Sequence, residues 1–196
     1  MNSAVFTDDP FVAKIDSYLK SHLSPMRYEH SLSTADTSSA LAAMFGYDQK
    51  RAFFTGLVHD IAREYSKEEL VEWAAKDGRP VRELDLASPV LLHGRAGAMV
   101  LKEKFGIQDQ DLLDALSSHT TGNAGMKTLA KILFVADYIE PKRKHITPEF
   151  ISSLEGLDLD GKVYAVLMGT LNHLADKGKS VAPEALELKQ ELEHAE

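Results

Sequence analysis

Four of the eight histidines in this 196-residue chain, together with two aspartates, follow one another in an order that suits metal binding. The six residues are His30, His59, Asp60, His93, His119 and Asp137. Imidazole nitrogens and carboxylate oxygens are typical ligands of divalent transition metals of intermediate softness. Several of the six follow apolar runs, and burying such polar groups costs free energy unless they share a partner. The pattern therefore predicts that the six side chains converge on a metal.

Basic residues accompany these candidate ligands, although the chain as a whole has a net charge of −8. Arg27, Arg63 and Arg95 each lie two to four positions from a candidate ligand. Five more basic residues crowd the sequence around Asp137, namely Lys127, Lys131, Lys142, Arg143 and Lys144. The acidic balance argues against a general nucleic-acid binder, which would carry a basic face. Cations beside metal ligands predict a small, highly charged anion as the substrate, although Lys131 and Lys144 equally suit an ordinary solvated helix face.

Length and composition fit one domain with a buried core. We expect this domain to span residues 1–178, with a helical extension, 179–196, packed on it. The apolar content is 44%, yet no apolar run approaches the roughly 18–20 residues of a membrane-spanning helix. The chain has no cysteine, and Asp8 and Asp9 stand where a secretory signal would be basic. These features predict a cytoplasmic protein that does not enter a membrane.

Signals for the start and the end of helices recur along the chain. One predicted helix starts at Ser24-Pro25 and runs to Gly46, and a capping box of Ser66 and Glu69 starts another. Further helices are expected from Asp48, from Ser88 to Gly106, from Asp109 to Ser118, from Met126 to Glu140, and from starts at Thr147, Asp160 and Pro183. No segment alternates like a half-buried strand. The predicted fold class is therefore all-α.

Five short strings carry the candidate ligands: Arg27-Tyr-Glu-His30, Gly56-Leu-Val-His-Asp60, Leu91-Leu-His-Gly94, His119-Thr-Thr-Gly122 and Val135-Ala-Asp-Tyr-Ile-Glu-Pro141. In these strings and their order, the chain resembles the HD-domain phosphohydrolases, and in particular the YqeK family of symmetrical bis(5′-nucleosyl)-tetraphosphatases. The resemblance covers about residues 10–175. It implies an HD-domain helical bundle that holds iron and cleaves diadenosine tetraphosphate into two molecules of ADP.

The resemblance also implies roles for the candidate ligands. His30, His59, Asp60 and Asp137 match the primary metal ligands of the family. His93 and His119 match positions that bind a second metal, with Asp60 as the bridge; with a single metal they would face the phosphates instead. We therefore expect one or two iron ions, with Mn, Co, Ni or Zn as substitutes. The expected partners are a dinucleoside polyphosphate and its nucleoside diphosphate product, with neither nucleic acid nor membrane, and a homodimer is left open.

The expected catalytic residues are Asp60, Arg63 and His119. Arg63 comes three residues after Asp60, on the same face of the predicted helix, and is the first choice for a phosphate contact. The other expected substrate contacts are Arg27, Arg95, Thr120, Thr121, Gly122, Lys127, Tyr138, Lys142 and Arg143. The hydroxyls and backbone N–H groups of 120–122 would hold phosphate. Alternatively, Tyr138, Lys142 and Arg143 are ordinary solvent-exposed residues at the end of the predicted helix.

Three alternatives remain at this point. Another HD enzyme, such as a 5′-nucleotidase or a guanosine-polyphosphate hydrolase, would share the metal ligands and differ in what holds the base. A metal-stabilised nucleotide sensor would bind without turnover. A structural metal site would only join helices. Such sites usually have a closed coordination shell of four protein ligands, whereas six candidate ligands with arginines beside them favour a site with open coordination positions.

Overall fold

The computed structural model describes residues 10–144 and 146–194, and all the regular elements in these ranges are helices. Asp8 and Asp9 lie outside the described residues. The helices are α1 (Pro10–His22), α2 (Pro25–Met44), α3 (Gln49–Val58), α4 (Lys67–Ala75), α5 (Glu83–Ala87), the 3₁₀ helix η2 (Pro89–Leu92), α6 (His93–Phe105), α7 (Gln110–Ser118), α8 (Thr128–Ile139), α9 (Pro148–Ser153), α10 (Leu159–Asp176) and α11 (Pro183–Glu193). The predicted all-α fold class is confirmed.

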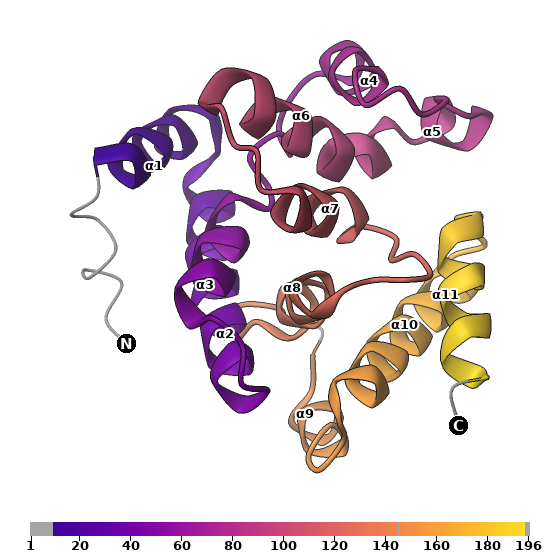
Figure 1. Cartoon of the computed structure of the whole chain (residues 1–196). Coiled ribbons are helices and arrows are strands. Elements are labelled where there is room, and N and C mark those ends of the chain that lie inside the picture. The colour runs from indigo at the N-terminus through magenta and orange to yellow at the C-terminus, as the bar shows by residue number, and fades with distance from the viewer. Residues whose placement is uncertain (1–9, 145, 195–196) are drawn as a thin grey trace.

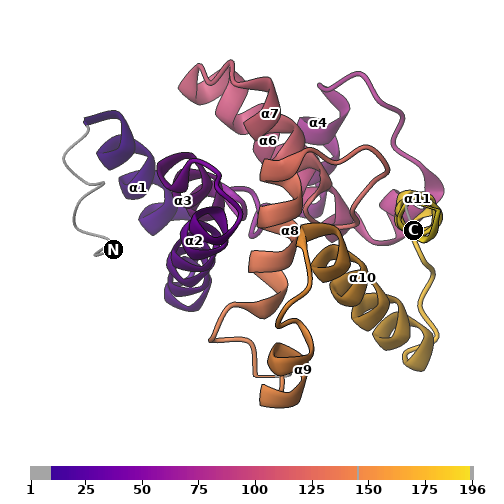
Figure 2. The same ribbon diagram turned by 60° about the horizontal axis from the view of Figure 1, so that its bottom comes forward.

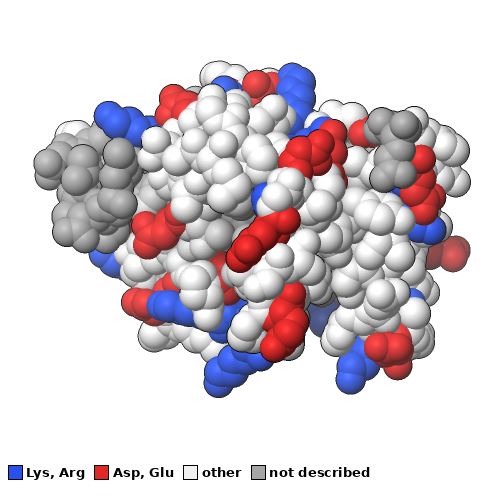
Figure 3. Space-filling view, turned by 90° about the horizontal axis from the view of Figure 1, so that it is seen from below, with Lys and Arg blue, Asp and Glu red and all other residues white. Residues whose placement is uncertain are grey.

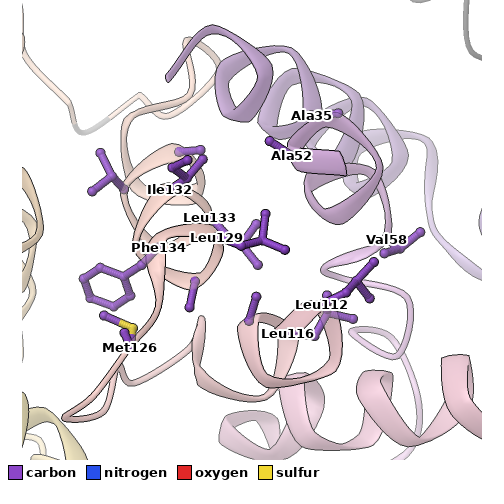
Figure 4. Close-up of a cluster of buried hydrophobic side chains, with 14 of the residues drawn as sticks. Ala35, Ala52, Val58, Leu112, Leu116, Met126, Leu129, Ile132, Leu133 and Phe134 are labelled. Atoms are coloured by element: carbon purple, nitrogen blue, oxygen red, sulfur yellow. The ribbon is translucent and has the colours of Figure 1, made fainter. Parts of the chain in front are cut away.

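Helix α8 lies at the centre of the bundle (Figures 1 and 2), between the α2–α3 pair on one side and α10 on the other. Its sequence is almost entirely apolar, so it is suited to burial on several sides. Figure 4 shows Leu129 and Leu133 of α8 beside Leu112 and Leu116 of α7, in the main core of the molecule. The central position of α8 matters because this helix carries Asp137.

Helices α2 and α3 pack unusually closely because the residues between them are small. A side chain at Gly56 would place its Cβ 2.7 Å from the Cα atom of Ala35. Ser31, Thr34 and Ser38 of α2 are buried along this helix as well. These residues make the part of α2 after His30 more polar than a typical core helix, but their side chains are small enough to let α3 pack closely against it. The close approach brings His30 on α2 near the end of α3.

Several predicted helix starts are confirmed by their hydrogen bonds. Asp48 accepts two N–H groups of the first turn of α3, Asp109 accepts the N–H of Leu112 in α7, and Ser66 with Glu69 forms the capping box of α4. The start of α10 was misplaced by two residues, because Asp158 and not Asp160 accepts the N–H of Gly161, at 2.8 Å.

Two predicted helices are shorter than expected. Helix α3 ends at Val58, and residues 59–64 form consecutive turns with i to i+3 hydrogen bonds, so Arg63 is not on a continuous helix with Asp60. The segment from Ser88 to Gly106 is divided into η2 and α6, which meet at His93. Both interruptions place a histidine at a helix end rather than on a helix face.

The C-terminal helix α11 packs against α10 and contributes Leu188 and Leu192 to the main core. Within residues 10–144 and 146–194, no helix is both long and apolar enough to cross a membrane.

Candidate metal centre

The six predicted ligands come together from five helices. His30 belongs to α2, His59 and Asp60 follow α3, His93 opens α6, His119 ends α7, and Asp137 lies in the last turn of α8. His59, Asp60 and His119 are almost fully buried, and His30 and His93 are buried too. Each residue offers an atom to one of three overlapping groups in which the atoms lie within 4.8 Å of one another. The convergence is the arrangement that the sequence pattern predicted.

Three of the four histidines occupy the same position at the end of a helix. The last turn of a helix leaves carbonyl groups without a partner in the helix. The Nδ1 atoms of His59, His93 and His119 hydrogen-bond the carbonyl three residues earlier, at 2.7, 2.5 and 2.7 Å. A carbonyl can only accept, so each Nδ1 carries a proton, and in the neutral ring each Nε2 then keeps its lone pair. These helix ends therefore orient three imidazole lone pairs toward the cluster.

His30 is oriented by a side chain instead. Its Nδ1 lies 3.0 Å from Oε1 of Glu140, a buried residue just beyond α8. Burial raises the pKa of Glu140, but hydrogen bonds from Ser33, His30 and the Lys142 backbone outweigh this effect and keep the pKa below its ordinary value. A carboxylate behind a histidine fixes the ring and makes it a better metal ligand. Glu140 was not assigned a role from sequence, although it lies within the string that contains Asp137.

The two carboxylate oxygens of Asp60 face two different sets of residues. Oδ2 lies 3.6 Å from Nε2 of His59 and 3.8 Å from Nε2 of His30. Oδ1 lies 3.1 Å from Nε2 of His93. On the first side, Asp137 completes the set, with Oδ1 2.9 Å from Nε2 of His30 and 3.6 Å from Nε2 of His59. Asp60 thus lies between two sets of ligands: His30 and His59, with Asp137 beside them, face Oδ2, and His93 with the adjacent His119 faces Oδ1.

Two histidine nitrogens approach each other closely in the second group. Nε2 of His93 and Nε2 of His119 are 2.9 Å apart, and both rings have their protons on Nδ1. Two lone pairs at this distance repel each other unless a proton or a metal ion lies between them. On the other side, Nε2 of His59 is fully buried and has no hydrogen-bond partner within the described part of the chain. The donor set therefore fits metal ions better than it fits hydrogen bonding.

The electrostatics of the cluster favour charged carboxylates. Burial raises the pKa of Asp60, but the adjacent His59 and His93 outweigh this effect and hold it well below the usual range. Burial also opposes ionisation of Asp137, while His30 at 2.9 Å and the nearby His59 and Arg143 bring its pKa well below the ordinary value. Burial lowers the pKa of His119 to about 3, whereas the charges of Asp60 and Asp137 outweigh burial at His59 and raise its pKa above the ordinary value, so a metal ion bound there would displace a proton. Anionic carboxylates and neutral imidazoles are the protonation states that bind metals.

Three arginines lie beside the cluster. Nη1 of Arg27 is 3.5 Å from Oδ2 of Asp60, and Nε of Arg63 is 4.0 Å from Oδ1 of Asp60. Arg143 pairs with the carboxylate of Asp137, donates to its carbonyl at 2.9 Å, and lies 3.5 Å from Nε2 of His30. Their guanidinium groups are about one quarter exposed. They are therefore placed to meet an anion that enters from solvent.

Other predicted substrate contacts are held elsewhere. Arg95 forms a two-bond ion pair with Asp77, at 2.8 Å for both Nε and Nη2, and also donates to backbone carbonyls. Lys127 pairs with Asp111 before the start of α8, ten residues from Asp137 and so about 15 Å away along the helix. Sequence proximity to a ligand did not bring either cation to the cluster. Arg95 comes two residues after His93 and so lies on another face of α6, and Lys127 lies at the opposite end of α8 from Asp137.

In the segment 120–122, some of the groups that were predicted to bind phosphate already have hydrogen-bond partners within the chain. The Thr120 hydroxyl lies 3.5 Å from Nε2 of His93, but the Thr121 hydroxyl donates to the carbonyl of Gly122. The N–H of Gly122 donates to the carbonyl of Ser118 at 2.7 Å, so it does not provide a phosphate contact.

The last two predicted contacts follow Asp137 in the chain. Tyr138 packs on Phe150 and against Gly169 of α10. Lys142 pairs with Glu29 at the surface. On the face seen in Figure 3, acidic and basic residues are interspersed rather than gathered into a basic area.

The family and relatives of the chain were found by comparison with known proteins. The model of the HD-domain family matches residues 27–142. The bis(5′-nucleosyl)-tetraphosphatase, symmetrical, of Halalkalibacterium halodurans is 33% identical, over 89% of this chain and 92% of the relative. The protein of the same name from Bacillus subtilis is 35% identical, over 85% of this chain and 89% of the relative.

A solved structure is similar throughout. It is a "predicted HD superfamily hydrolase involved in NAD metabolism" from Clostridium acetobutylicum, with a TM-score of 0.88 and 34% identity. The similarity covers 94% of this chain and 98% of that one, so the arrangement of helices around the cluster is shared.

Proposed function

The chain belongs to the HD-domain family, and we propose that it is a metal-dependent hydrolase that cleaves diadenosine tetraphosphate symmetrically into two molecules of ADP. The observation that carries the proposal is the cluster around Asp60, together with relatives of that activity that match along most of the chain. Six ligand residues in overlapping groups, five of them buried, with arginines at the edge, suit a reaction on phosphates.

We assign His30, His59, Asp60 and Asp137 to a first metal ion and His93, His119 and Asp60 to a second. The support for two ions is the position of Asp60, whose oxygens face the two groups separately. A shared carboxylate between neighbouring metals is typical of two-metal hydrolytic sites. Iron is our proposed metal, and Mn, Co, Ni and Zn suit the same nitrogen and oxygen ligands.

Such an ion, when bound, lowers the pKa of a coordinated water and polarises a phosphoryl oxygen. The residues of the chain supply the rest of the catalytic arrangement. Charge spreads over the phosphoryl oxygens in the transition state and is stabilised by fixed cations. Arg27 and Arg63 lie on the side of Asp60, whereas Arg143 lies on the side of Asp137 and His30. Three cations around Asp60 and Asp137 can hold several phosphates of the chain next to the bond to be cleaved.

The proposal is tested with a panel of nucleotides and the purified protein loaded with metal. Diadenosine tetraphosphate, AMP and a guanosine polyphosphate are offered in parallel, and wild type is compared with Asp60→Asn, which keeps the side-chain shape but loses the charge. We expect turnover of diadenosine tetraphosphate by the wild type only. Release of adenosine from AMP, or turnover of the guanosine polyphosphate as the main activity, would contradict the proposal and favour another HD enzyme.

A further inference from the structure

An apolar cavity with a volume of about 640 Å³ lies between α2 and the segment that follows α8. One wall is formed by Ser33, Asp36, Thr37 and Ala40 of α2. The opposite wall comes from residues within 139–143 and 146–151, mainly through isoleucine and proline side chains. Binding pockets for small molecules typically measure about 300–1,000 Å³ and combine apolar walls with a few polar groups. The cavity therefore has the size and lining of a ligand site.

The cavity is continuous with the candidate metal centre through two side chains. Glu140 lines the cavity and also bonds Nδ1 of His30. Arg143 lines the cavity and also contacts Asp137 and His30. Glu140 is anionic and stands behind His30, so the connection suited to an anion is Arg143: a ligand whose phosphate pairs with Arg143 would have its charged end beside the cluster and its apolar part in the cavity.

The distances along α2 fit a nucleoside. Thr37 is seven residues after His30, which places it two turns further on the same face, about 10 Å along the helix. The opposite wall offers Ile139, Ile146 and Ile151, whose apolar side chains can pack against the faces of a purine ring. The hydroxyls of Ser33 and Thr37 and the Asp36 carboxylate are polar groups at the other wall. A phosphate at Arg143 would leave the attached ribose and base in the cavity.

We propose that this cavity binds one nucleoside of the dinucleotide substrate, and hence the nucleoside of the ADP product, while its phosphates lie at Arg143 and the metal centre. The proposal rests on the proposed function for the identity of the ligand. It adds determinants of substrate binding that lie outside the metal ligands, namely Thr37, Ala40 and Ile151.

The test fills the cavity without touching the cluster. Ala40→Trp places an indole in the cavity from an exposed position of α2, and Ala43→Trp places the same group on the same helix outside the cavity. A second variant, Ile151→Ala, removes part of the opposite wall. Calorimetry measures the binding of ADP and of pyrophosphate, which has no nucleoside, and elemental analysis measures the metal content.

We expect Ala40→Trp to weaken ADP binding about tenfold or more and Ile151→Ala to weaken it less. Pyrophosphate binding and metal content should remain as in wild type, and Ala43→Trp should resemble wild type throughout. Unchanged ADP affinity in both cavity variants, or an equal loss of ADP and pyrophosphate binding, would overturn the proposal. Because binding is measured separately from cleavage, an ADP site that passes this test in a protein that fails to cleave diadenosine tetraphosphate would refute the reaction and not the cavity.

Discussion

Oδ1 of Asp60 lies 3.1 Å from Nε2 of His93, whereas the other oxygen of the same carboxylate, Oδ2, lies 3.6 Å from Nε2 of His59. One buried aspartate thus connects two groups of histidines that come from different helices. This relationship supports the assignment of two metal ions.

The first prediction concerns the number of ions. His93→Ala should reduce the bound metal from two ions per chain to one, since His30, His59, Asp60 and Asp137 remain. His22→Ala, at an exposed histidine of α1, is the matched control and should retain both ions. Elemental analysis of the purified proteins measures the ratio. An unchanged ratio in His93→Ala would remove this residue from the ligand set.

The second prediction separates two arginines that look alike in the sequence. Arg63→Ala should lower kcat/KM by about 10–100-fold, because a charge-assisted contact to phosphate contributes about 1.5–3 kcal/mol to the transition state. Arg95→Ala should leave kcat/KM near the wild-type value, since Arg95 pairs with Asp77 instead. Steady-state kinetics on diadenosine tetraphosphate measure both, and equal losses in the two variants would contradict the placement of Arg95.

The third prediction assigns Arg95 to stability. Burial raises the pKa of Asp77, but hydrogen bonds from Arg95 and Arg79 outweigh this and lower it. A folded-state pKa below the unfolded value means that the ion pair stabilises the fold at neutral pH, and that this contribution is lost as the pH falls through the folded pKa. Arg95→Ala should therefore cost about 1–3 kcal/mol at pH 7 and progressively less in acid.

Arg79→Ala is the control for this prediction, because Arg79 pairs with the same Asp77 from a side chain that is 53% exposed. Exposed ion pairs contribute little, about 0–1 kcal/mol. Chemical denaturation at a series of pH values measures the free energy of unfolding. A cost for Arg95→Ala that does not change with pH would show that the charge of Asp77 is not involved.

The fourth prediction concerns Gly94, where helices α6 and α7 approach closely. A Cβ atom at this position would collide with the carbonyl of Leu116 and lie 3.1 Å from Nδ1 of His119. That carbonyl is the acceptor that orients His119. Gly94→Ala should therefore cost about 1–3 kcal/mol of stability and reduce metal binding.

Gly97→Ala on the same helix is the comparison for Gly94→Ala. Its Cβ would meet a side-chain methyl of Ile61 at 3.1 Å, which can shift, and no backbone group at a similar distance. Metal content and thermal unfolding should therefore change less. If the two variants behave alike, the position of the Leu116 carbonyl is not what makes Gly94 necessary.

The sequence predicted the helices and the six candidate ligands because these depend on local signals. Proline, glycine and capping residues mark helix ends, and His93 and His119 stand next to them. Arg95 and Lys127 were predicted to contact substrate, but they pair with Asp77 and Asp111 instead. The sequence did not indicate these pairs because the acidic partners are distant in sequence or on another helix. Glu140 was overlooked for a similar reason: its contact with His30 joins residues 110 positions apart. Only the packing of α2 against α8 brings them together.

The most direct test of the account is the identity of the products formed from diadenosine tetraphosphate in ¹⁸O-labelled water. We predict ADP as the only nucleotide product, with one labelled oxygen on the terminal phosphate of half of the ADP molecules. The same reaction should be absent from Asp60→Asn. Formation of ATP and AMP would show that an outer and not the central phosphoanhydride bond is broken and would contradict symmetrical cleavage by this cluster.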